Sequence, residues 1–239
     1  MAELEASQAP EGAPESPKAV LREVILVYLV TLLAIRGVVS VQRSAGLPPD
    51  VLILVPLLFI YAPRLWLKRI DRRPDDYGME LYDLKGALWF NLKMGLAVFP
   101  AFILLNHLYQ GVVFDRSPGA ILPSNLLLNV VLYHLLYAAL PEEIFYRGYV
   151  QTRLNEVMAK KWRLFGVSFG WSLPLTALLF TVGHSIVEPR WWHFAIFIPG
   201  LLFGWIRERS SNVLPSTFFH ALCNITMVLL DTAYGVIPP

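Results

Sequence analysis

Long apolar stretches separated by short charged ones dominate the pattern of this chain. The stretches lie at residues 24–41, 49–63, 86–108, 121–140, 172–187, 191–206 and 213–232. Most of them approach the ~20 residues that an α-helix needs to cross the hydrocarbon core of a bilayer. The pattern therefore predicts an all-α, polytopic membrane protein with about seven or eight transmembrane helices. The eighth would arise if residues 142–158 also cross the membrane.

The composition supports this class of protein. Hydrophobic residues make up 56% of the chain and charged residues only 16%, whereas about a quarter of an average soluble domain is charged. The mean hydropathy of +0.52 makes a large soluble helical protein the weaker alternative. The basic residues lie scattered at the ends of the stretches, so we expect no nucleic-acid partner. Cys223 is the one cysteine, and no internal disulfide can form.

The chain divides into three predicted regions. Residues 1–19 are rich in Ala, Glu and Pro and lack an apolar period, which is typical of a disordered tail. This stretch is acidic where a signal peptide is basic, so we expect the first apolar stretch to be retained as a helix. N-terminal transmembrane helices are expected at 20–115, and a second transmembrane core at 122–235.

Basic residues predict the orientation in the membrane. They cluster after the second, fourth and sixth stretches, and loops rich in Lys and Arg stay in the cytoplasm. With seven spans all three clusters fall on one side, together with the N-terminus, and the C-terminus lies opposite. We expect an integral protein of a bacterial inner membrane. The clusters are Arg64, Lys68, Arg69, Arg72 and Arg73; Arg147, Arg153, Lys160, Lys161 and Arg163; and Arg207 and Arg209.

The first group of charged residues near the apolar stretches contains both acidic and basic side chains. Glu142 and Glu143 follow Pro141 and precede Arg147. On a helix, Glu143 and Arg147 share one face in the favourable order, with the acid first. Glu142 is turned ~100° away from its neighbour. The pair can neutralise itself, which leaves Glu142 free to face another group.

Two further groups of polar side chains stand on later apolar stretches. His184 lies about a dozen residues into the stretch from 172 and one turn after Phe180, which predicts a position near the middle of the bilayer. His220 and Asn224 are also one turn apart and share a helix face. Because ionisable groups inside a span cost ~2.5–3.5 kcal/mol each, they are functional candidates. A carboxylate with a histidine can activate water, and a histidine with an asparagine can bind an oxyanion.

Three motifs in order, EExxxR, FxxxH and HxxxN, make a more specific case. They comprise Glu142 to Arg147, Phe180 to His184, and His220 to Asn224. Their order and spacing resemble those of the CAAX protease and bacteriocin-processing (CPBP) family of intramembrane endopeptidases. The resemblance covers roughly residues 122–232. It implies a glutamate-dependent, CAAX-type intramembrane protease with a polar catalytic cavity between its helices.

The resemblance also implies the role of each residue. Glu142, helped by His184, would activate a water, and His220 and Asn224 would form the oxyanion site. Glu143 and Arg147, with Phe180, would support the geometry. The expected partners are the lipid bilayer and a membrane-anchored protein or peptide with a CAAX-like or C-terminal sorting sequence. Two histidines and a glutamate could also bind zinc, but no HExxH motif is present. We expect no metal and leave zinc open.

Pro141 poses a geometric problem for this site. The apolar stretch before Pro141 is long enough to span, which would place Glu142 at the membrane surface while His184 lies at mid-bilayer. We therefore expect the helix to bend at Pro141, or the span to tilt and start late. Polar residues in such a core are tolerated where they line a water-filled cavity, which we expect to open to the cytoplasmic leaflet.

Two other functions stay open. Residues 166–170 place Ser168 in the GxSxG pattern of serine hydrolases, but that pattern needs a strand, a turn and a helix, and no strand is predicted here. Charged groups inside a bundle also serve non-proteolytic transport or scaffold proteins. Gly200 and Gly204 predict a close helix contact. The remaining histidines are interpreted as structural: His107, His134 and His193.

Overall fold

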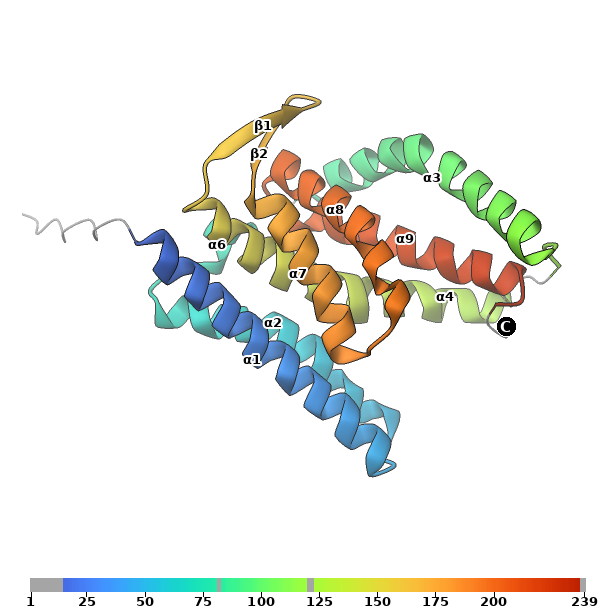
Figure 1. Cartoon of the computed structure of the whole chain (residues 1–239), viewed down its shortest axis with the longest axis horizontal. Helices are drawn as coiled ribbons and strands as arrows, with labels where there is room; N and C mark the ends of the chain where they lie inside the picture. The colour runs from blue at the N-terminus through green and yellow to red at the C-terminus, as the bar shows by residue number, and fades with distance from the viewer. Residues whose placement is uncertain (1–14, 81–82, 120–122, 237–239) are drawn as a thin grey trace, which may run out of the picture.

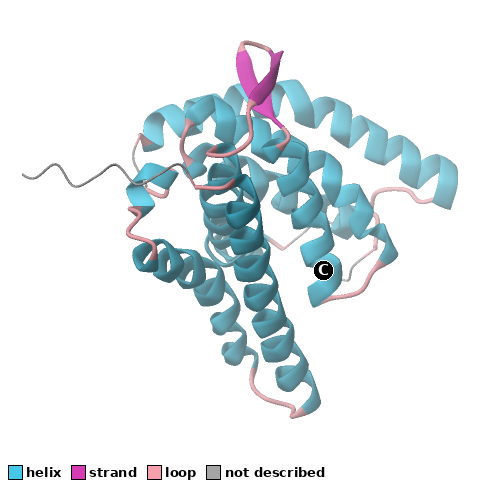
Figure 2. Cartoon of the chain, turned by 60° about the vertical axis from the view of Figure 1, so that its left-hand side comes forward, coloured by secondary structure: helices cyan, strands magenta, loops and turns pink. Residues whose placement is uncertain are grey.

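The computed structural model describes residues 15–80, 83–119 and 123–236, and nearly all of these residues are helical (Figure 2). The predicted all-α membrane class is confirmed, with one addition. Strands β1 (Lys160–Leu164) and β2 (Val167–Gly170) form an antiparallel hairpin. The prediction that no strand occurs is wrong at this place. β2 leads directly into α7 (Ser172–Val187).

The predicted apolar stretches are confirmed as helices within the described residues. α1 (Pro17–Ser44) is followed by a 3₁₀ turn (Pro49–Ile53) and α2 (Leu54–Arg69). A second 3₁₀ turn (Pro74–Tyr77) precedes α3 (Leu84–Phe114). After α7, a 3₁₀ turn (Trp191–Ile196) leads into α8 (Phe197–Ser210), and α9 (Val213–Ala233) ends the fold.

Fewer helices than predicted are long enough to cross a membrane. Within the described residues, four segments have the length and apolar character for a span: Pro17–Ser44, Pro49–Arg69, Leu84–Phe114 and Val213–Ala233. Ser172–Val187 is apolar but shorter, and α8 has only 14 residues. Seven or eight full-length spans are therefore not supported, although the chain is built as an integral membrane protein.

A single long helix carries Glu142. It comprises α4 (Ser124–Leu132), a π-helical segment (Tyr133–Ala139), α5 (Leu140–Glu143), a second π-helical segment (Ile144–Gln151) and α6 (Thr152–Asn155). The backbone stays right-handed helical through the junctions, with φ −60° and ψ −49° at Leu140. Pro141 has no N–H for an intrahelical bond, and wide π turns flank it on both sides. The helix continues through Pro141 instead of ending there, so Glu142 lies inside the bundle.

The helices pack around the second π-helical segment, in which every residue is buried. α1 and α2 form a pair on one side, and α1 packs on α7 (Figure 1). The Tyr28 hydroxyl donates to the Leu179 carbonyl at 2.8 Å. α7, α8 and α9 follow one another across the bundle, and α3 packs on α9. The α1–α2 pair, which sequence assigned to a separate N-terminal region, therefore forms part of the walls around Glu142.

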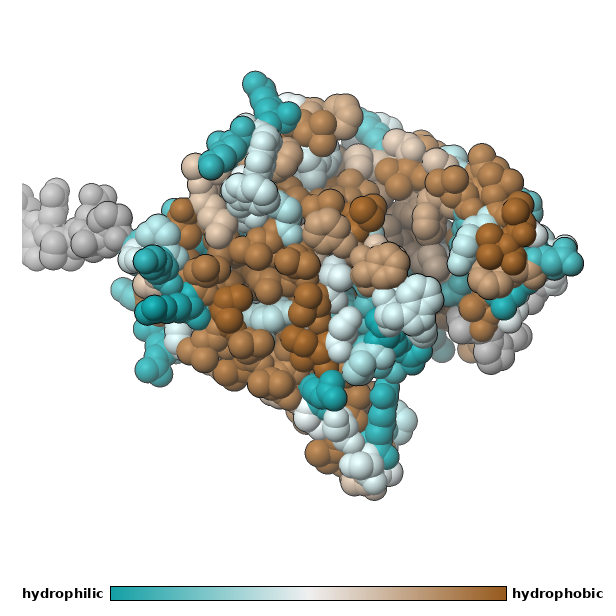
Figure 3. Space-filling view, in the orientation of Figure 1, coloured by the Kyte–Doolittle hydropathy of each residue, from teal (hydrophilic) through white to brown (hydrophobic). Residues whose placement is uncertain are grey.

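The outer surface is largely apolar. Figure 3 shows a broad hydrophobic face over α1 and α7, with hydrophilic residues gathered toward both ends of α1. On α3, Leu96 is 70% exposed and Val112 is 82% exposed. Soluble monomers rarely expose contiguous apolar patches of this extent, whereas lipid tails accommodate them.

One end of the bundle gathers the three basic clusters, except for Arg147, which is buried inside the bundle. Arg72 donates to Glu15 at 3.3 Å, and Arg153 pairs with both Glu15 and Glu23. Arg207 donates to the Tyr77 carbonyl at 2.9 Å. Residues 1–14 lie outside the described residues, and α1 begins at Pro17, inside the predicted tail. A proline suits the first position of a helix, and Glu15 before it is held by ion pairs.

Candidate active site

Three side chains from three helices converge at the middle of the bundle. The Oε2 atom of Glu142, on α5, lies 4.0 Å from Nε2 of His184 on α7 and 3.9 Å from Nε2 of His220 on α9. This Oε2 atom is buried and has no hydrogen-bond partner in the described part of the chain. A buried acceptor without a partner is uncommon. The arrangement leaves a position between the three groups that one water molecule can bridge.

Hydrogen bonds on the far side of each imidazole set the direction of its ring. Nδ1 of His184 donates to the Phe180 carbonyl at 2.8 Å, one turn earlier on α7. Nδ1 of His220 donates to Oε1 of Glu143 at 3.0 Å. Because Nδ1 is engaged in both rings, Nε2 of each is presented to Glu142.

Glu143 and Arg147 form the predicted ion pair, and each also makes a hydrogen bond to another helix. Their side chains are 0% exposed, and Nη1 of Arg147 lies 2.8 Å from Oε1 of Glu143. Nη2 of Arg147 donates to the Gly200 carbonyl at 3.1 Å. Oε1 of Glu143 thus accepts from both Arg147 and His220. The pair connects the long helix to α8 and α9.

Aromatic rings enclose the charged groups. The Arg147 guanidinium lies 4.4 Å from the centroid of Phe180 and 5.2 Å from that of Phe203. Phe180 meets His184 edge-on at 4.7 Å, and Phe203 stacks on His220 at 4.6 Å. The FxxxH motif pointed to Phe180, but sequence gave no signal for Phe203, which lies between the two predicted glycines of α8. Both rings fix the histidines by packing.

Asn224 follows His220 by one turn of α9 and is half-buried. The two residues share a helix face, as their spacing predicts. Within the described residues, no hydrogen bond joins Asn224 to Glu142 or to the histidines. Its assignment to the oxyanion site therefore stays a prediction.

A cavity of about 180 Å³ is lined by two of the candidate residues, Glu142 and His184. Glu142 and His184 lie on one wall, and α1 and α2 supply apolar side chains to the other. His184 stands in the last turn of α7, and its predicted depth near the middle of the bilayer stays a prediction. The lining residues are Leu32, Ile35, Val55, Phe59, Glu142, Tyr146, Gly183, His184, Val187, Glu188 and His193.

His193 belongs to this cavity, although sequence placed it only at a membrane interface. Its ring centroid lies 5.7 Å from that of His184, and its Nδ1 atom is buried without a hydrogen-bond partner in the described residues. The neighbouring residues Val187 and Glu188 directly follow the site on α7. The cavity therefore extends toward the end of the bundle away from the basic clusters.

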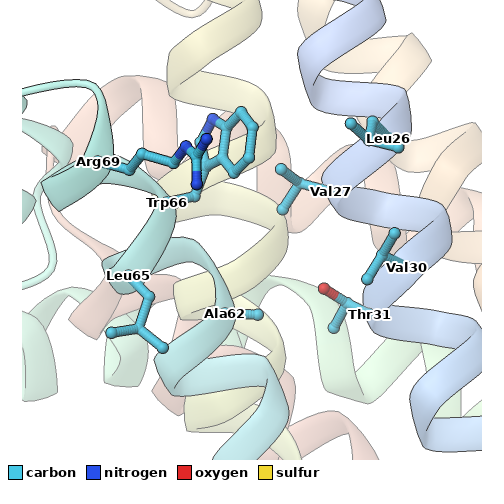
Figure 4. A pocket seen from close by; sticks show the side chains of 8 residues that line it. All are labelled: Leu26, Val27, Val30, Thr31, Ala62, Leu65, Trp66 and Arg69. Atoms are coloured by element: carbon cyan, nitrogen blue, oxygen red, sulfur yellow. The ribbon is translucent and has the colours of Figure 1, made fainter.

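A larger groove of about 490 Å³ lies elsewhere, between α1 and α2. Figure 4 shows Leu26, Val27 and Val30 of α1 facing Trp66 and Arg69 of α2 across it. None of the catalytic candidates lines this groove. Its lining is mostly apolar, with Thr31 and Arg69 as polar members.

Ser168 lies apart from the converging groups. It is exposed on β2, opposite Arg163 of β1. The strand and helix that a nucleophile elbow needs are present, because α7 begins at Ser172. In that elbow, however, the serine occupies the turn between them, whereas here Trp171 alone lies between β2 and α7. The geometry favours Glu142 over Ser168 as the reactive group.

The distances between the candidate ligand atoms test whether the site fits a zinc ion. Ligands ~2.0–2.1 Å from a tetrahedral zinc are ~3.3 Å apart. The atoms of Glu142, His184 and His220 are separated by 3.9 Å and 4.0 Å. No group of three His, Cys, Asp or Glu within the described ranges has a metal-binding arrangement. As placed, these residues do not fit the metal, and a metal-free site stays a prediction.

Gly183, next to His184, has no side chain, and the Tyr146 hydroxyl occupies the space where one would lie. A Cβ atom at this residue would lie 2.2 Å from the Tyr146 hydroxyl. We therefore expect Gly183→Ala to destabilise the protein by about 1–3 kcal/mol through overpacking. Thermal unfolding in detergent measures the effect, and Tyr146→Phe, which deletes the hydroxyl, should relieve it. Equal stability of Gly183→Ala and wild type would show that the ring moves aside freely.

The close helix contact predicted at Gly200 and Gly204 of α8 is also confirmed. A Cβ atom on Gly200 would lie 3.3 Å from the Phe180 ring, and one on Gly204 would lie 3.0 Å from Leu173. α8 can therefore approach α7 closely enough for the Gly200 carbonyl to accept from Arg147.

Comparison with known proteins agrees with the geometry. Residues 123–226 match the family described as type II CAAX prenyl endopeptidase Rce1-like. The matched region contains all three motifs, which confirms the resemblance found from the sequence. No curated protein and no solved structure matches the chain.

Proposed function

We propose that this chain, with its Rce1-like type II CAAX prenyl endopeptidase region, is an intramembrane endopeptidase that uses Glu142 to activate water. The observation that carries the proposal is the convergence of Glu142, His184 and His220 around one buried, unpartnered carboxylate oxygen. The family supports a peptide hydrolase integral to the membrane. The substrate is a membrane-anchored protein or peptide.

In the first step, Glu142 removes a proton from a water held between it and Nε2 of His184. The resulting hydroxide attacks the carbonyl carbon of the scissile bond and forms a tetrahedral intermediate. The protonated Glu142 then donates its proton to the leaving amine as the C–N bond breaks. Glu142 ends as a carboxylate, and the two products are a carboxylic acid and an amine, so the cycle balances.

His220 and Asn224 stabilise the negative oxygen of the intermediate in this scheme. His220 faces the intermediate through Nε2, because its Nδ1 atom is held by the Glu143 carboxylate at 3.0 Å. Arg147 holds Glu143 in place. Donors fixed before the reaction stabilise developing charge more effectively than water does.

The proposal is tested in a bacterial membrane. Wild type and Glu142→Gln are expressed to equal levels, and the membrane proteomes are compared for truncated products. We expect products with wild type only. Equal cleavage by Glu142→Gln, with loss in Ser168→Ala, would replace the glutamate mechanism by a serine one. Loss of wild-type cleavage on chelation, with recovery on added zinc, would show that the reaction depends on a metal and would overturn the metal-free mechanism.

A non-proteolytic transport or scaffold function is distinguished by the same comparison. It predicts no wild-type product in any host membrane tested, and it predicts that Glu142→Gln rescues a deletion phenotype as well as wild type does. An intramembrane protease predicts that this variant fails to rescue.

A further inference from the structure

Helix α7 gives a measure of depth in the membrane. Exposed aromatic residues, which gather at membrane interfaces, flank both of its ends: Trp171 is 57% exposed and Trp191 is 77% exposed. The helix has 16 residues and so a length of ~24 Å, which is shorter than the ~30 Å hydrocarbon thickness. Its two tryptophan-flanked ends therefore mark the directions of the two membrane faces, and not a complete crossing.

The catalytic groups lie near only one of these faces. His184 is three residues from the end of α7 at Val187, or ~4.5 Å along the axis, and ~18 Å from Ser172 at the other end. Glu142 lies 4.0 Å from His184 and shares its depth. Reactive water and the scissile bond are therefore closest to the face that carries Trp191.

The cavity reaches this same face through a charged rim. Glu188 and His193 continue the lining beyond the last turn of α7. Glu188 pairs with Arg190 at 2.6 Å and with Arg43, at the end of α1, at 3.3 Å. The hydrogen bond from Arg190 lowers the pKa of Glu188, so this rim is charged and hydrated.

The basic clusters lie at the opposite face. Hydrogen bonds between Arg72 and Glu15, and between Arg207 and Tyr77, hold two of them together, and Arg153 of the third also pairs with Glu15. Lys160, Lys161 and Arg163 of the same cluster as Arg153 lie on the hairpin that precedes α7. By contrast, the turns at the cavity end carry Arg43, Arg116 and Arg190. Loops rich in Lys and Arg stay in the cytoplasm, so the cavity end is the extracytoplasmic one.

We propose that the substrate is an exported protein whose scissile bond lies at the extracytoplasmic face of the membrane, and not a prenylated C-terminus presented from the cytoplasm. This inference rests on the proposed function and names its substrate class. The apolar wall formed by Leu32, Ile35 and Phe59 suits an apolar segment of the substrate that enters from the outer leaflet. The charged rim supplies the water for hydrolysis.

Cysteine labelling tests the orientation directly, because the chain has one native cysteine to remove. In a Cys223→Ala background, Ser44→Cys marks the cavity end, and Ser168→Cys marks the hairpin at the basic end. Both serines are exposed. Spheroplasts are treated with a membrane-impermeant maleimide before and after lysis. We expect the Ser44→Cys variant to react in intact spheroplasts, and the Ser168→Cys variant to react only after lysis.

The controls separate this inference from the proposed function. A cytoplasmic thiol protein of the host must stay unlabelled before lysis, and each variant must retain wild-type cleavage of the host proteome. The reverse labelling pattern, with cleavage that still depends on Glu142, would overturn the extracytoplasmic substrate and leave the protease standing. The expected labelling, with cleavage sites mapped to cytoplasmic segments, would overturn it as well.

Discussion

Replacing Glu142 by Gln is expected to reduce the rate of peptide cleavage by about 10²–10⁴-fold, the contribution typical of a general base. The amide keeps the shape of the side chain but cannot accept a proton from water. In the wild type, Oε2 of Glu142 has no hydrogen-bond partner within the described residues. The substitution therefore breaks no hydrogen bond at this atom, and the fold should be unaffected. Cleavage of a substrate peptide identified from the host proteome measures the rate, and thermal unfolding checks the fold.

His184 provides the matched test of whether the two residues act as a unit. If both position the same water, His184→Gln alone should cause a large loss of rate, and adding it to Glu142→Gln should cost little more, since groups that act together are non-additive. Fully multiplicative losses would show that His184 acts in a separate step. A single variant Glu142→Gln with wild-type activity would remove the base assignment altogether.

Breaking the ion pair inside the bundle is expected to have the largest effect on stability. Arg147→Met would leave Glu143 as a buried charge with only His220 to oppose it, and removal of one partner of a buried pair costs about 3–5 kcal/mol. Unfolding in detergent measures this loss. The double variant Glu143→Gln with Arg147→Met removes both charges and should recover a substantial part of the stability.

An exposed pair in the same chain supplies the control. Arg73 and Asp75 lie 3.0 Å apart, and the Arg73 side chain is 76% exposed. Arg73→Met should therefore cost less than ~1 kcal/mol. Equal losses for Arg73→Met and Arg147→Met would contradict the importance of burial, and an unrecovered double variant would show that Arg147 acts mainly through its aromatic and Gly200 contacts.

Local spacing predicted much of the site. The i, i+4 relation of Glu143 and Arg147 fixed their pairing, because helix geometry alone brings such residues together. The same relation placed His184 beside Phe180. The positions of the apolar stretches followed from hydropathy, since every backbone polar group in lipid must be satisfied within a helix.

Contacts between distant parts of the chain could not be predicted in this way. Glu143 and His220 are separated by 77 positions, and no spacing rule connects them. Phe203 and His193 reach the site only because α8 folds back along α7. The position of His184 in the last turn of α7 depends on where that helix ends, and the apolar pattern alone does not define that end.

The passage through Pro141 was the hardest feature to predict. A proline within an apolar run usually indicates a bend or a helix end. Here the π-helical turns on either side carry the helix onward. Such turns have no reliable sequence signature, although they often mark functional sites in helices. The geometric problem that sequence posed is resolved by this one continuous helix.

Oε1 of Glu143, which accepts from both Arg147 and His220, has a consequence for how the protein assembles in the membrane. Arg147 compensates the Glu143 charge within the long helix itself, but the bonds from Arg147 to Gly200 and from His220 to Glu143 form only when α8 and α9 have packed. Until α9 packs, His220 lacks the contact that orients its ring. Under the proposed function, proteolytic competence would therefore arrive only with completion of the bundle.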